Sequence, residues 1–119
     1  MARFLLINRC RAGQGPEEGT AAHDDEMREW GLFNRAVRDS GELVWSLALD
    51  DPGGAVAHGV DPDGRPARVT GRQAASEGIF ALYLVDVSDS AGAEEWARRM
   101  PTARYGTVEV RAVLDDQAR

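Results

Sequence analysis

The chain contains no lysine: all 14 basic residues among its 119 are arginine. This excludes Schiff-base chemistry, a lysine general base and the lysine of a phosphate-binding P-loop. A single cysteine, Cys10, excludes an internal disulfide bond and a cysteine-based structural zinc site. No apolar run approaches the roughly 20 residues of a membrane-spanning helix, and the first residues lack a signal-peptide core. We therefore expect a soluble, cytoplasmic protein without membrane contact.

The charge of the chain is negative, with 20 acidic and 14 basic residues and a net charge of −6. Binding to nucleic acid would require clustered positive charge, so we expect no nucleic-acid partner. The length fits one domain of roughly 100–200 residues. We expect a single domain over residues 1–119, with a polar tail from about residue 114.

Apolar periodicity predicts the order strand, helix, strand, hairpin, strand, helix, strand. The strands are expected at 3–8, 43–49, 79–87 and 107–113, and the hairpin arms at 56–60 and 65–69. The first helix is expected to begin at Asp24 or Asp25, either of which can cap it, and to end before Gly41. Its buried stripe should be Met27, Trp30, Phe33 and Val37. The second helix should bury Ala93, Trp96, Ala97 and Met100 and stop at Pro101.

This order is typical of the ferredoxin-like split βαβ fold, an α+β arrangement with both helices on one face of an antiparallel sheet. The strands at 3–8 and 79–87 are nevertheless apolar on both faces. A second copy of the chain is the simplest cover for the other face. We therefore predict a homodimer that packs through its sheets.

Five segments carry a family resemblance: WGLF at 30–33, SGELV at 40–44, YLVDV at 83–87, AEEWA at 93–97 and PTARYGTVEVR at 101–111. They resemble the YCII-related family and, within it, the DGPF branch. The ending P-x-A-R-Y-G-x-V-E-V-R is the most specific of them. The resemblance implies a ferredoxin-like fold that forms a homodimer of the dimeric α+β barrel type.

The chain also departs from the family pattern. The Asp-Gly-Pro-Phe signature of the branch is replaced by TGRQAASE at 70–77, which retains only Glu77 of a following Lys-Glu pair. In the enzyme-like branch a histidine on the first helix pairs with an aspartate. Trp30 occupies that histidine position and Asp39 lies near the aspartate position, so the pair does not carry over.

Two histidines are candidates for catalysis. His58 lies between Ala57 and Gly59 in the hairpin, and these small neighbours leave room for a ligand. Pairing of Val60 with Arg65 would place it opposite Ala67, which is also small. His23 with Asp24 is the second candidate, as a general base beside a carboxylate. A half-exposed strand histidine and a solvated helix start are the alternative interpretations.

Other residues are candidates for ligand binding. Arg9 and Arg72 fall at strand or loop ends, where an arginine suits a carboxylate or phenolate. Trp45 is expected in the core, or in a pocket on the sheet face. Tyr105 can hydrogen-bond a ligand or brace a dimer. Cys10 stands between Arg9 and Arg11, whose charges would lower the pKa of its thiol.

No metal-ligand spacing, catalytic triad or dinucleotide fingerprint is present, so we expect no metal and no cofactor. Two functions stay open. The first is a small-molecule enzyme that transfers protons in an elimination, isomerisation or cyclisation of an aromatic or polyketide-like substrate, with His58 as base. The second is a non-catalytic module that acts with another protein such as a sigma factor, a pairing that the DGPF branch implies.

Overall fold

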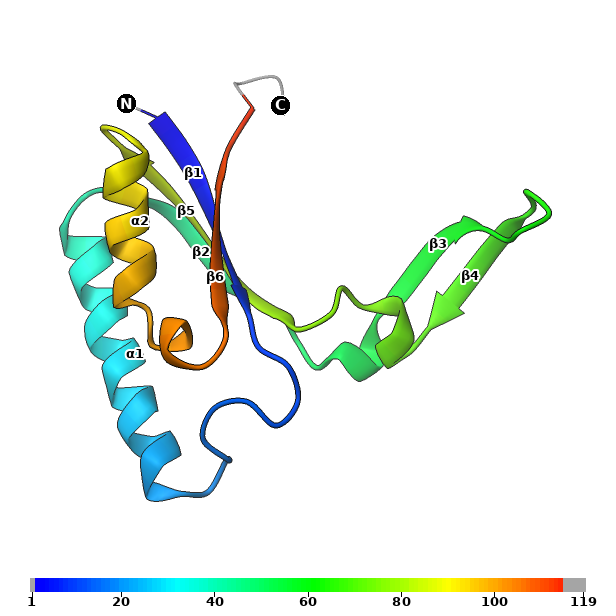
Figure 1. Cartoon of the computed structure of the whole chain (residues 1–119), viewed down its shortest axis with the longest axis horizontal. Coiled ribbons are helices and arrows are strands. Elements are labelled where there is room, and N and C mark those ends of the chain that lie inside the picture. The colour runs from blue at the N-terminus through cyan, green and yellow to red at the C-terminus, as the bar shows by residue number, and fades with distance from the viewer. Residues whose placement is uncertain (1, 115–119) are drawn as a thin grey trace.

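The computed structural model describes residues 2–114 (Figure 1). Its strands are β1 (Ala2–Arg9), β2 (Leu43–Ala48), β3 (Val56–Val60), β4 (Pro66–Thr70), β5 (Ile79–Val87) and β6 (Thr107–Ala112). The α-helices are α1 (Ala21–Asp39) and α2 (Ser90–Arg99), and short 3-10 helices are η1 (Pro52–Gly54), η2 (Arg72–Ala74) and η3 (Pro101–Arg104). The expected polar tail lies, apart from Leu114, outside the described residues.

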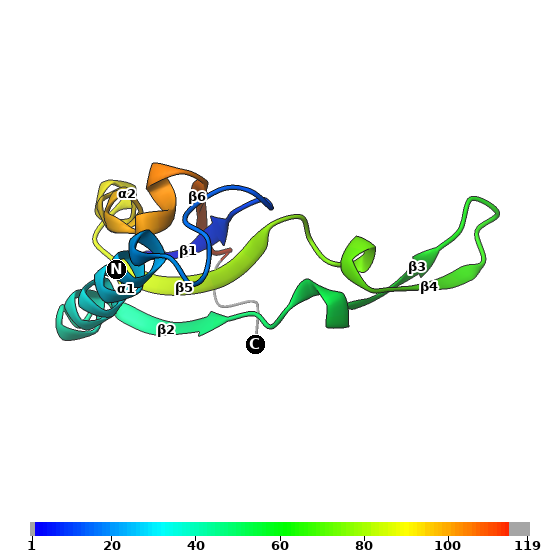
Figure 2. The ribbon, with the colours of Figure 1, turned by 90° about the horizontal axis from the view of Figure 1, so that it is seen from below.

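Four strands form one antiparallel sheet in the order β2-β5-β1-β6. Helix α1 connects β1 to β2 across β5, and α2 connects β5 to β6 across β1. Both helices lie on the same face of this sheet, and the opposite face is open (Figure 2). The α+β architecture with an antiparallel split βαβ sheet is therefore confirmed.

The core lies between the helices and the covered face of the sheet. Fully buried side chains come from every layer, among them Leu6 of β1, Val37 of α1, Val85 of β5 and Met100. The ring of Phe33 forms its centre, because it makes edge-to-face contacts with Trp30, Tyr83 and Trp96 at centroid distances of 5.8, 5.6 and 5.9 Å. The buried face expected for α2, namely Ala93, Trp96, Ala97 and Met100, is confirmed.

The start of α1 differs from the expectation. Thr20, and not Asp24 or Asp25, caps the helix: its hydroxyl accepts the backbone N–H of His23 at 3.2 Å. In the first turns of α1 the buried face also differs from the expected one by one residue. Met27 is 48% exposed, whereas the neighbouring Glu26 is buried.

Trp45 does not belong to the core, which corrects the interpretation of all three tryptophans as core residues. A register shift between Leu43 and Trp45 in β2 changes which residues face the helices. Leu43 pairs with Val85 on the covered face, but Trp45 pairs with Leu84 on the open face. The indole of Trp45 is 41% exposed, because β2 is an edge strand and nothing in the described chain covers it.

Strands β3 and β4 form a separate two-stranded ribbon that projects away from the rest of the molecule (Figures 1 and 2). Its register differs by one residue from the expected one: Val60 pairs with Pro66, and His58 lies opposite Arg68 rather than Ala67. The turn explains this difference. The carboxylate of Asp61 accepts the N–H of Arg65 at 2.9 Å, so Arg65 belongs to the turn and not to the strand.

The ribbon makes the molecule extended. Its radius of gyration is 16.5 Å, whereas about 13.5 Å is typical of a compact domain of this length. Within residues 2–114 no helix combines the length and the apolar character that crossing a membrane requires.

The packing around Phe33 yields a stability prediction. Phe33→Ala removes the ring that three other aromatic side chains contact, so we expect the free energy of unfolding to fall by about 3–5 kcal/mol. Urea denaturation followed by circular dichroism measures this loss. The adjacent Leu32→Ala, at a side chain that is 66% exposed, should cost about 0.5 kcal/mol or less. Equal losses in the two variants would contradict the assigned core.

Candidate functional site

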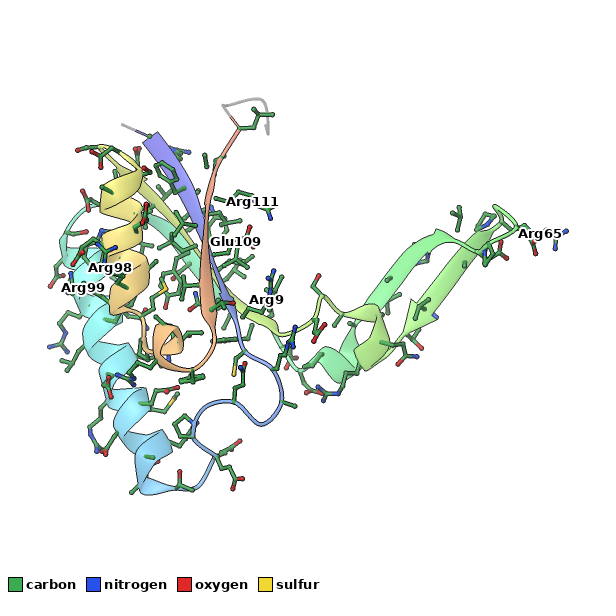
Figure 3. The ribbon with its side chains drawn as sticks, in the orientation of Figure 1. Arg9, Arg65, Arg98, Arg99, Glu109 and Arg111 are labelled. Atoms are coloured by element: carbon green, nitrogen blue, oxygen red, sulfur yellow. The ribbon has the colours of Figure 1, made fainter. Side chains whose placement is uncertain are left out.

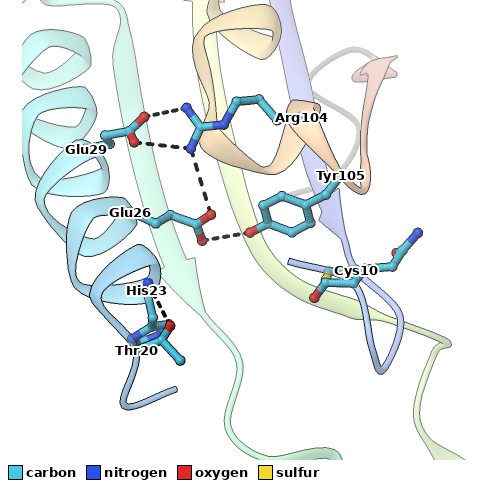
Figure 4. Close-up of polar contacts among 8 residues, drawn as sticks. Cys10, Thr20, His23, Glu26, Glu29, Arg104 and Tyr105 are labelled. Atoms are coloured by element: carbon cyan, nitrogen blue, oxygen red, sulfur yellow. Dashed lines mark hydrogen bonds and ion pairs between the residues drawn. The ribbon is translucent and has the colours of Figure 1, made fainter. Parts of the chain in front are cut away.

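Glu26 is a buried carboxylate in the second turn of α1, with an exposed fraction of only 6%. Its Oε2 accepts a hydrogen bond from the Tyr105 hydroxyl at 2.7 Å. Its Oε1 lies 3.9 Å from a guanidinium nitrogen of Arg104, which is an ion-pair distance but too long for a hydrogen bond. Because an isolated buried charge is costly, these two residues make the burial of Glu26 tolerable (Figure 4).

The turn after α2 positions both partners of Glu26. Pro101 starts η3, and the carbonyl of Thr102 accepts the N–H groups of Tyr105 and Gly106 at 3.2 and 2.8 Å. Gly106 lets this turn lie against β1, since a Cβ atom there would overlap the carbonyl oxygen of Arg9. The motif P-T-A-R-Y-G thus directs the side chains of Arg104 and Tyr105 towards α1.

Arg104 bridges two carboxylates of α1. It donates hydrogen bonds to both oxygens of Glu29, one at 3.2 Å, and it also faces Glu26. The hydrogen bond from Arg104 lowers the pKa of Glu29 below its usual value. Together the three groups carry two negative charges and one positive charge, so the cluster keeps one net negative charge.

The Tyr105 hydroxyl stays protonated at neutral pH. Burial raises the pKa of Tyr105, and the hydrogen bond to Glu26 and the negative charge of that carboxylate raise it further. Tyr105 is therefore a neutral phenol that donates a hydrogen bond to Glu26, and not a phenolate.

Residues 10–20 form a loop that covers Tyr105. Gly15 packs against the phenol ring so closely that a Cβ atom there would lie 2.6 Å from Cε1. The backbone of Gly15 also has a φ of +78°, which favours glycine. The loop is closed by contacts within itself, such as the N–H of Arg11 to the side-chain oxygen of Gln14 at 2.8 Å.

The pKa of the Cys10 thiol is raised, not lowered as its arginine neighbours suggested. Burial is the larger cause, and the negative charge of Glu26 is the second. The two arginines are engaged elsewhere: Arg9 pairs with Glu109 at 3.5 Å and Arg11 pairs with Glu77 at 3.1 Å. The same Glu26 thus influences both Cys10 and Tyr105.

A cleft of about 710 Å³ lies between the start of this loop, the base of the ribbon and the start of β5. Its walls are Cys10, Arg11, Ala12, Pro52, Arg72, Gln73, Ala75, Ser76, Glu77, Gly78, Ile79 and Phe80. Cys10 belongs to this wall and lies beside Tyr105 (Figure 4), so the cleft and the Glu26–Tyr105 pair are neighbours.

The four ligand-binding candidates from the sequence are distributed over three places. Tyr105 is in the buried pair, and Arg72 lines the cleft, where it faces Asp51 at 3.6 Å. Trp45 and Arg9 lie on the open face of the sheet, and Arg9 forms a charged row with Glu109 and Arg111 (Figure 3).

The histidines lie apart from the cleft walls. His58 is exposed on the ribbon, whereas His23 and Asp24 belong to the first turn of α1. Their role in catalysis stays a prediction. Within residues 2–114 no group of three or more potential metal ligands comes together.

The sequence interpretation missed Glu26, although a signal was present. The spacing 26, 30, 33, 37 follows the helix period as well as the spacing that begins at Met27. Met27 is expected on the buried stripe because it is hydrophobic. A glutamate is normally exposed unless a partner for its charge is buried with it, and the sequence shows no such partner for Glu26. That partner, Tyr105, is 79 residues away in the sequence.

A comparison with known protein families matches residues 3–116 to the YCII-related domain. The chain belongs to the YCII-related domain family. No protein with a curated description matches it. In this YCII-related domain, the segment at 70–77 forms one wall of the cleft through Arg72, Gln73, Ala75, Ser76 and Glu77.

The environment of Cys10 predicts its reactivity. Since the folded protein raises the pKa of this thiol, alkylation by iodoacetamide should reach half its maximal rate at a higher pH than in the urea-unfolded chain. Glu26→Gln removes the neighbouring negative charge and should move the folded profile to lower pH. The control Glu95→Gln, on the exposed side of α2, should leave it unchanged. A profile insensitive to Glu26→Gln would contradict the assigned contact.

Proposed function

We propose that this YCII-related domain is an enzyme that binds a small organic molecule in the cleft and transfers a proton with Glu26. One observation carries the proposal: among the described residues, Oε1 of the buried Glu26 has no hydrogen-bond partner. Most buried polar side-chain atoms have at least one hydrogen-bond partner, and a catalytic role is one of the explanations for an exception. Oε1 of Glu26 is therefore a buried proton acceptor that no hydrogen bond of the described chain engages, although Arg104 lies 3.9 Å from it.

The chemistry that fits is abstraction of a proton next to a carbonyl group. The C–H bond of the substrate breaks, the proton binds to Oε1 of Glu26, and the electron pair moves to the substrate carbonyl oxygen to give an enolate. Return of the proton to a different atom completes an isomerisation, whereas loss of a leaving group completes an elimination. Both belong to the reaction types that the sequence suggested.

Tyr105 and Arg104 are positioning residues in this scheme. The hydroxyl of Tyr105 fixes the orientation of the carboxylate at 2.7 Å, and Arg104 ties Glu26 to Glu29 on the surface of α1. Removal of the Tyr105 hydroxyl would leave both oxygens of a buried carboxylate without a hydrogen bond.

Proton transfer is testable without knowledge of the substrate. We expect the wild-type protein to accelerate deuterium incorporation into the acidic C–H of 1-phenylbutane-1,3-dione in D2O, measured by proton NMR. Glu26→Gln keeps the shape but cannot accept the proton, so the acceleration should fall by about 100- to 10,000-fold. Tyr105→Phe should reduce it less. Glu95→Gln is the matched control, and a Glu26→Gln variant as active as this control would refute the role of Glu26.

We further propose that the domain acts as a homodimer of the dimeric α+β barrel type. The open face of the sheet carries an apolar set, composed of Leu5, Ile7, Trp45, Leu47, Leu82 and Leu84. The chain exposes 8108 Å², whereas a compact monomer of its mass exposes about 6,300 Å². The projecting ribbon contributes to this excess of about 1,800 Å². The apolar set itself, in which Trp45 and Leu47 are 41% and 45% exposed, is what supports a second copy.

Ion pairs border the apolar set of the open face. Along β6 Glu109 is held by Arg9 and Arg111, and at the far end of β1 and β5 Arg3 pairs with Asp86 at 3.7 Å. Asp86 offsets Arg3 and Glu109 offsets one of its two arginines, so each copy brings one positive charge without a carboxylate partner to the border of the apolar set.

The mass in solution tests the dimer. Light scattering coupled to size exclusion should give twice the chain mass of 12.9 kDa for the wild type. Leu47→Asp places a charge on the open face and should give a monomer, because burying that carboxylate in the interface is unfavourable. Leu32→Asp, on the exposed side of α1, should remain dimeric. A monomeric wild type at micromolar concentration would overturn the proposal.

A non-catalytic module that binds another protein, such as a sigma factor, is the second candidate. Exposed apolar residues in and just after β2 favour it, because Trp45, Leu47 and Leu49 are 41%, 45% and 48% exposed. Proton exchange distinguishes the two candidate functions. An enzyme accelerates it, whereas a module that only binds another protein does not.

A further inference from the structure

We propose that the group presented to Glu26 is an uncharged hydroxyl or carbonyl group on an apolar molecule, and that it enters beneath the loop 10–20. This inference rests on the proposed function and names the ligand class of the same site. It excludes small carboxylates and phosphates as the reacting group.

Two more buried side chains at this end of the sheet have polar atoms without partners. Asn8 is fully buried near the end of β1, and neither its amide nitrogen nor its amide oxygen has a hydrogen bond within the described chain. The hydroxyl of Thr102, also fully buried, has none either. Asn8 pairs with Val108, two residues after the Gly106 that hydrogen-bonds to Thr102, so both residues lie near the Tyr105 turn.

The hydrogen-bonding capacity of these atoms defines the ligand. The amide nitrogen of Asn8 can only donate, its amide oxygen and Oε1 of Glu26 can only accept, and the Thr102 hydroxyl can do both. A neutral keto–enol or hydroxy-ketone group offers both an acceptor and a donor and so matches this set. A carboxylate group offers acceptors only.

The negative charge of the Glu26–Glu29–Arg104 cluster is a second reason against an anionic ligand group at Glu26. The only cation in the cluster, Arg104, is already shared between Glu29 and Glu26, and the three groups keep one net negative charge. An anionic ligand group beside the open oxygen of Glu26 would meet a like charge in a place of low dielectric, which is strongly unfavourable.

The cleft supplies the place for an apolar body. Pro52, Ile79 and Phe80 contribute its apolar wall, and Cys10 joins this wall to the site of Glu26 and Tyr105. Cys10 follows Asn8 by two residues, so a ligand whose apolar end lies in the cleft can place its polar end near the buried cluster.

The loop 10–20 has the properties of a lid over this path. Several of its hydrogen bonds stay within the loop, including Gln14 N–H to the Arg11 carbonyl at 3.0 Å and Thr20 N–H to the Glu17 carbonyl at 3.2 Å. Its contact with the body at Gly15 is a packing contact with the Tyr105 ring. Opening at Gly15 would therefore uncover Tyr105 without breaking a hydrogen bond of that glycine to the sheet.

Ligand class is tested by two probes with the same phenyl ketone body. The neutral 1-phenylbutane-1,3-dione should bind the wild type at least about tenfold more tightly than the anionic benzoylformate, measured at pH 6.5 by titration NMR. Glu26→Gln removes the charge, so this preference should fall to about twofold or less, whereas Glu95→Gln should retain it.

Three outcomes overturn the proposal: equal or tighter binding of benzoylformate to the wild type, a preference unchanged by Glu26→Gln, or no binding of the neutral probe to the folded protein. The result is independent of catalysis. If the neutral preference depends on Glu26 but no proton exchange occurs, the ligand class stands and the proposed enzyme function falls.

The lid is tested by the single cysteine, with two glycines as a matched pair. Gly15→Ala forces a Cβ atom into the Tyr105 ring, whereas Gly13→Ala introduces the same substitution at a similar φ of +87° with nothing within 4 Å. Alkylation of Cys10 should be several-fold faster in Gly15→Ala than in Gly13→Ala, and saturating 1-phenylbutane-1,3-dione should slow it in the wild type. Equal rates in the two variants, with both folded by circular dichroism, would contradict a lid held at Gly15.

Discussion

The two helices of this chain can cover only one face of its four-stranded sheet, and most other features of the molecule depend on that constraint. The aromatic cluster around Phe33 fills the covered side, where α1, α2, β1 and β5 meet. The other side retains leucine, isoleucine and tryptophan side chains of β1, β2 and β5. Covering an apolar face of this kind is favourable, which is the physical reason for the second subunit that we propose.

The interior of the covered side is not wholly apolar, and its polar part is confined to one end. Glu26, Asn8 and Thr102 are buried near the turn that carries Arg104 and Tyr105. Apolar residues at these three positions would stabilise the core at least as well, because buried polar atoms without hydrogen-bond partners cost free energy. The presence of polar residues at the end of the sheet next to the cleft therefore supports the proposed site.

The ribbon of β3 and β4 is the second departure from a compact domain. An isolated two-stranded ribbon is marginally stable in water, yet this one exposes valines such as Val60, which is 72% exposed. Its base, through η1 and η2, forms the outer wall of the cleft. The segment at 70–77, which contains η2, therefore belongs to the wall of the cleft.

The sequence by itself determined the helices and strands, their order and the split βαβ fold, because apolar periodicity acts over neighbouring positions, although it placed the start of α1 at Asp24 or Asp25 and not after Thr20. It also determined Tyr105 and Arg72 as candidates, since both stand in recognisable turns or motifs. It did not determine that Glu26 replaces Met27 on the buried stripe, that the register shift exposes Trp45, or that Arg65 stays in the turn and brings His58 opposite Arg68. Each of these depends on a partner distant in the sequence or on a local hydrogen bond that periodicity does not record: Tyr105 for Glu26, β5 for Trp45 and the Asp61 carboxylate for Arg65. Only the tertiary structure decided them, because the free energy of burying a charge or shifting a register is set by what the fold places next to it.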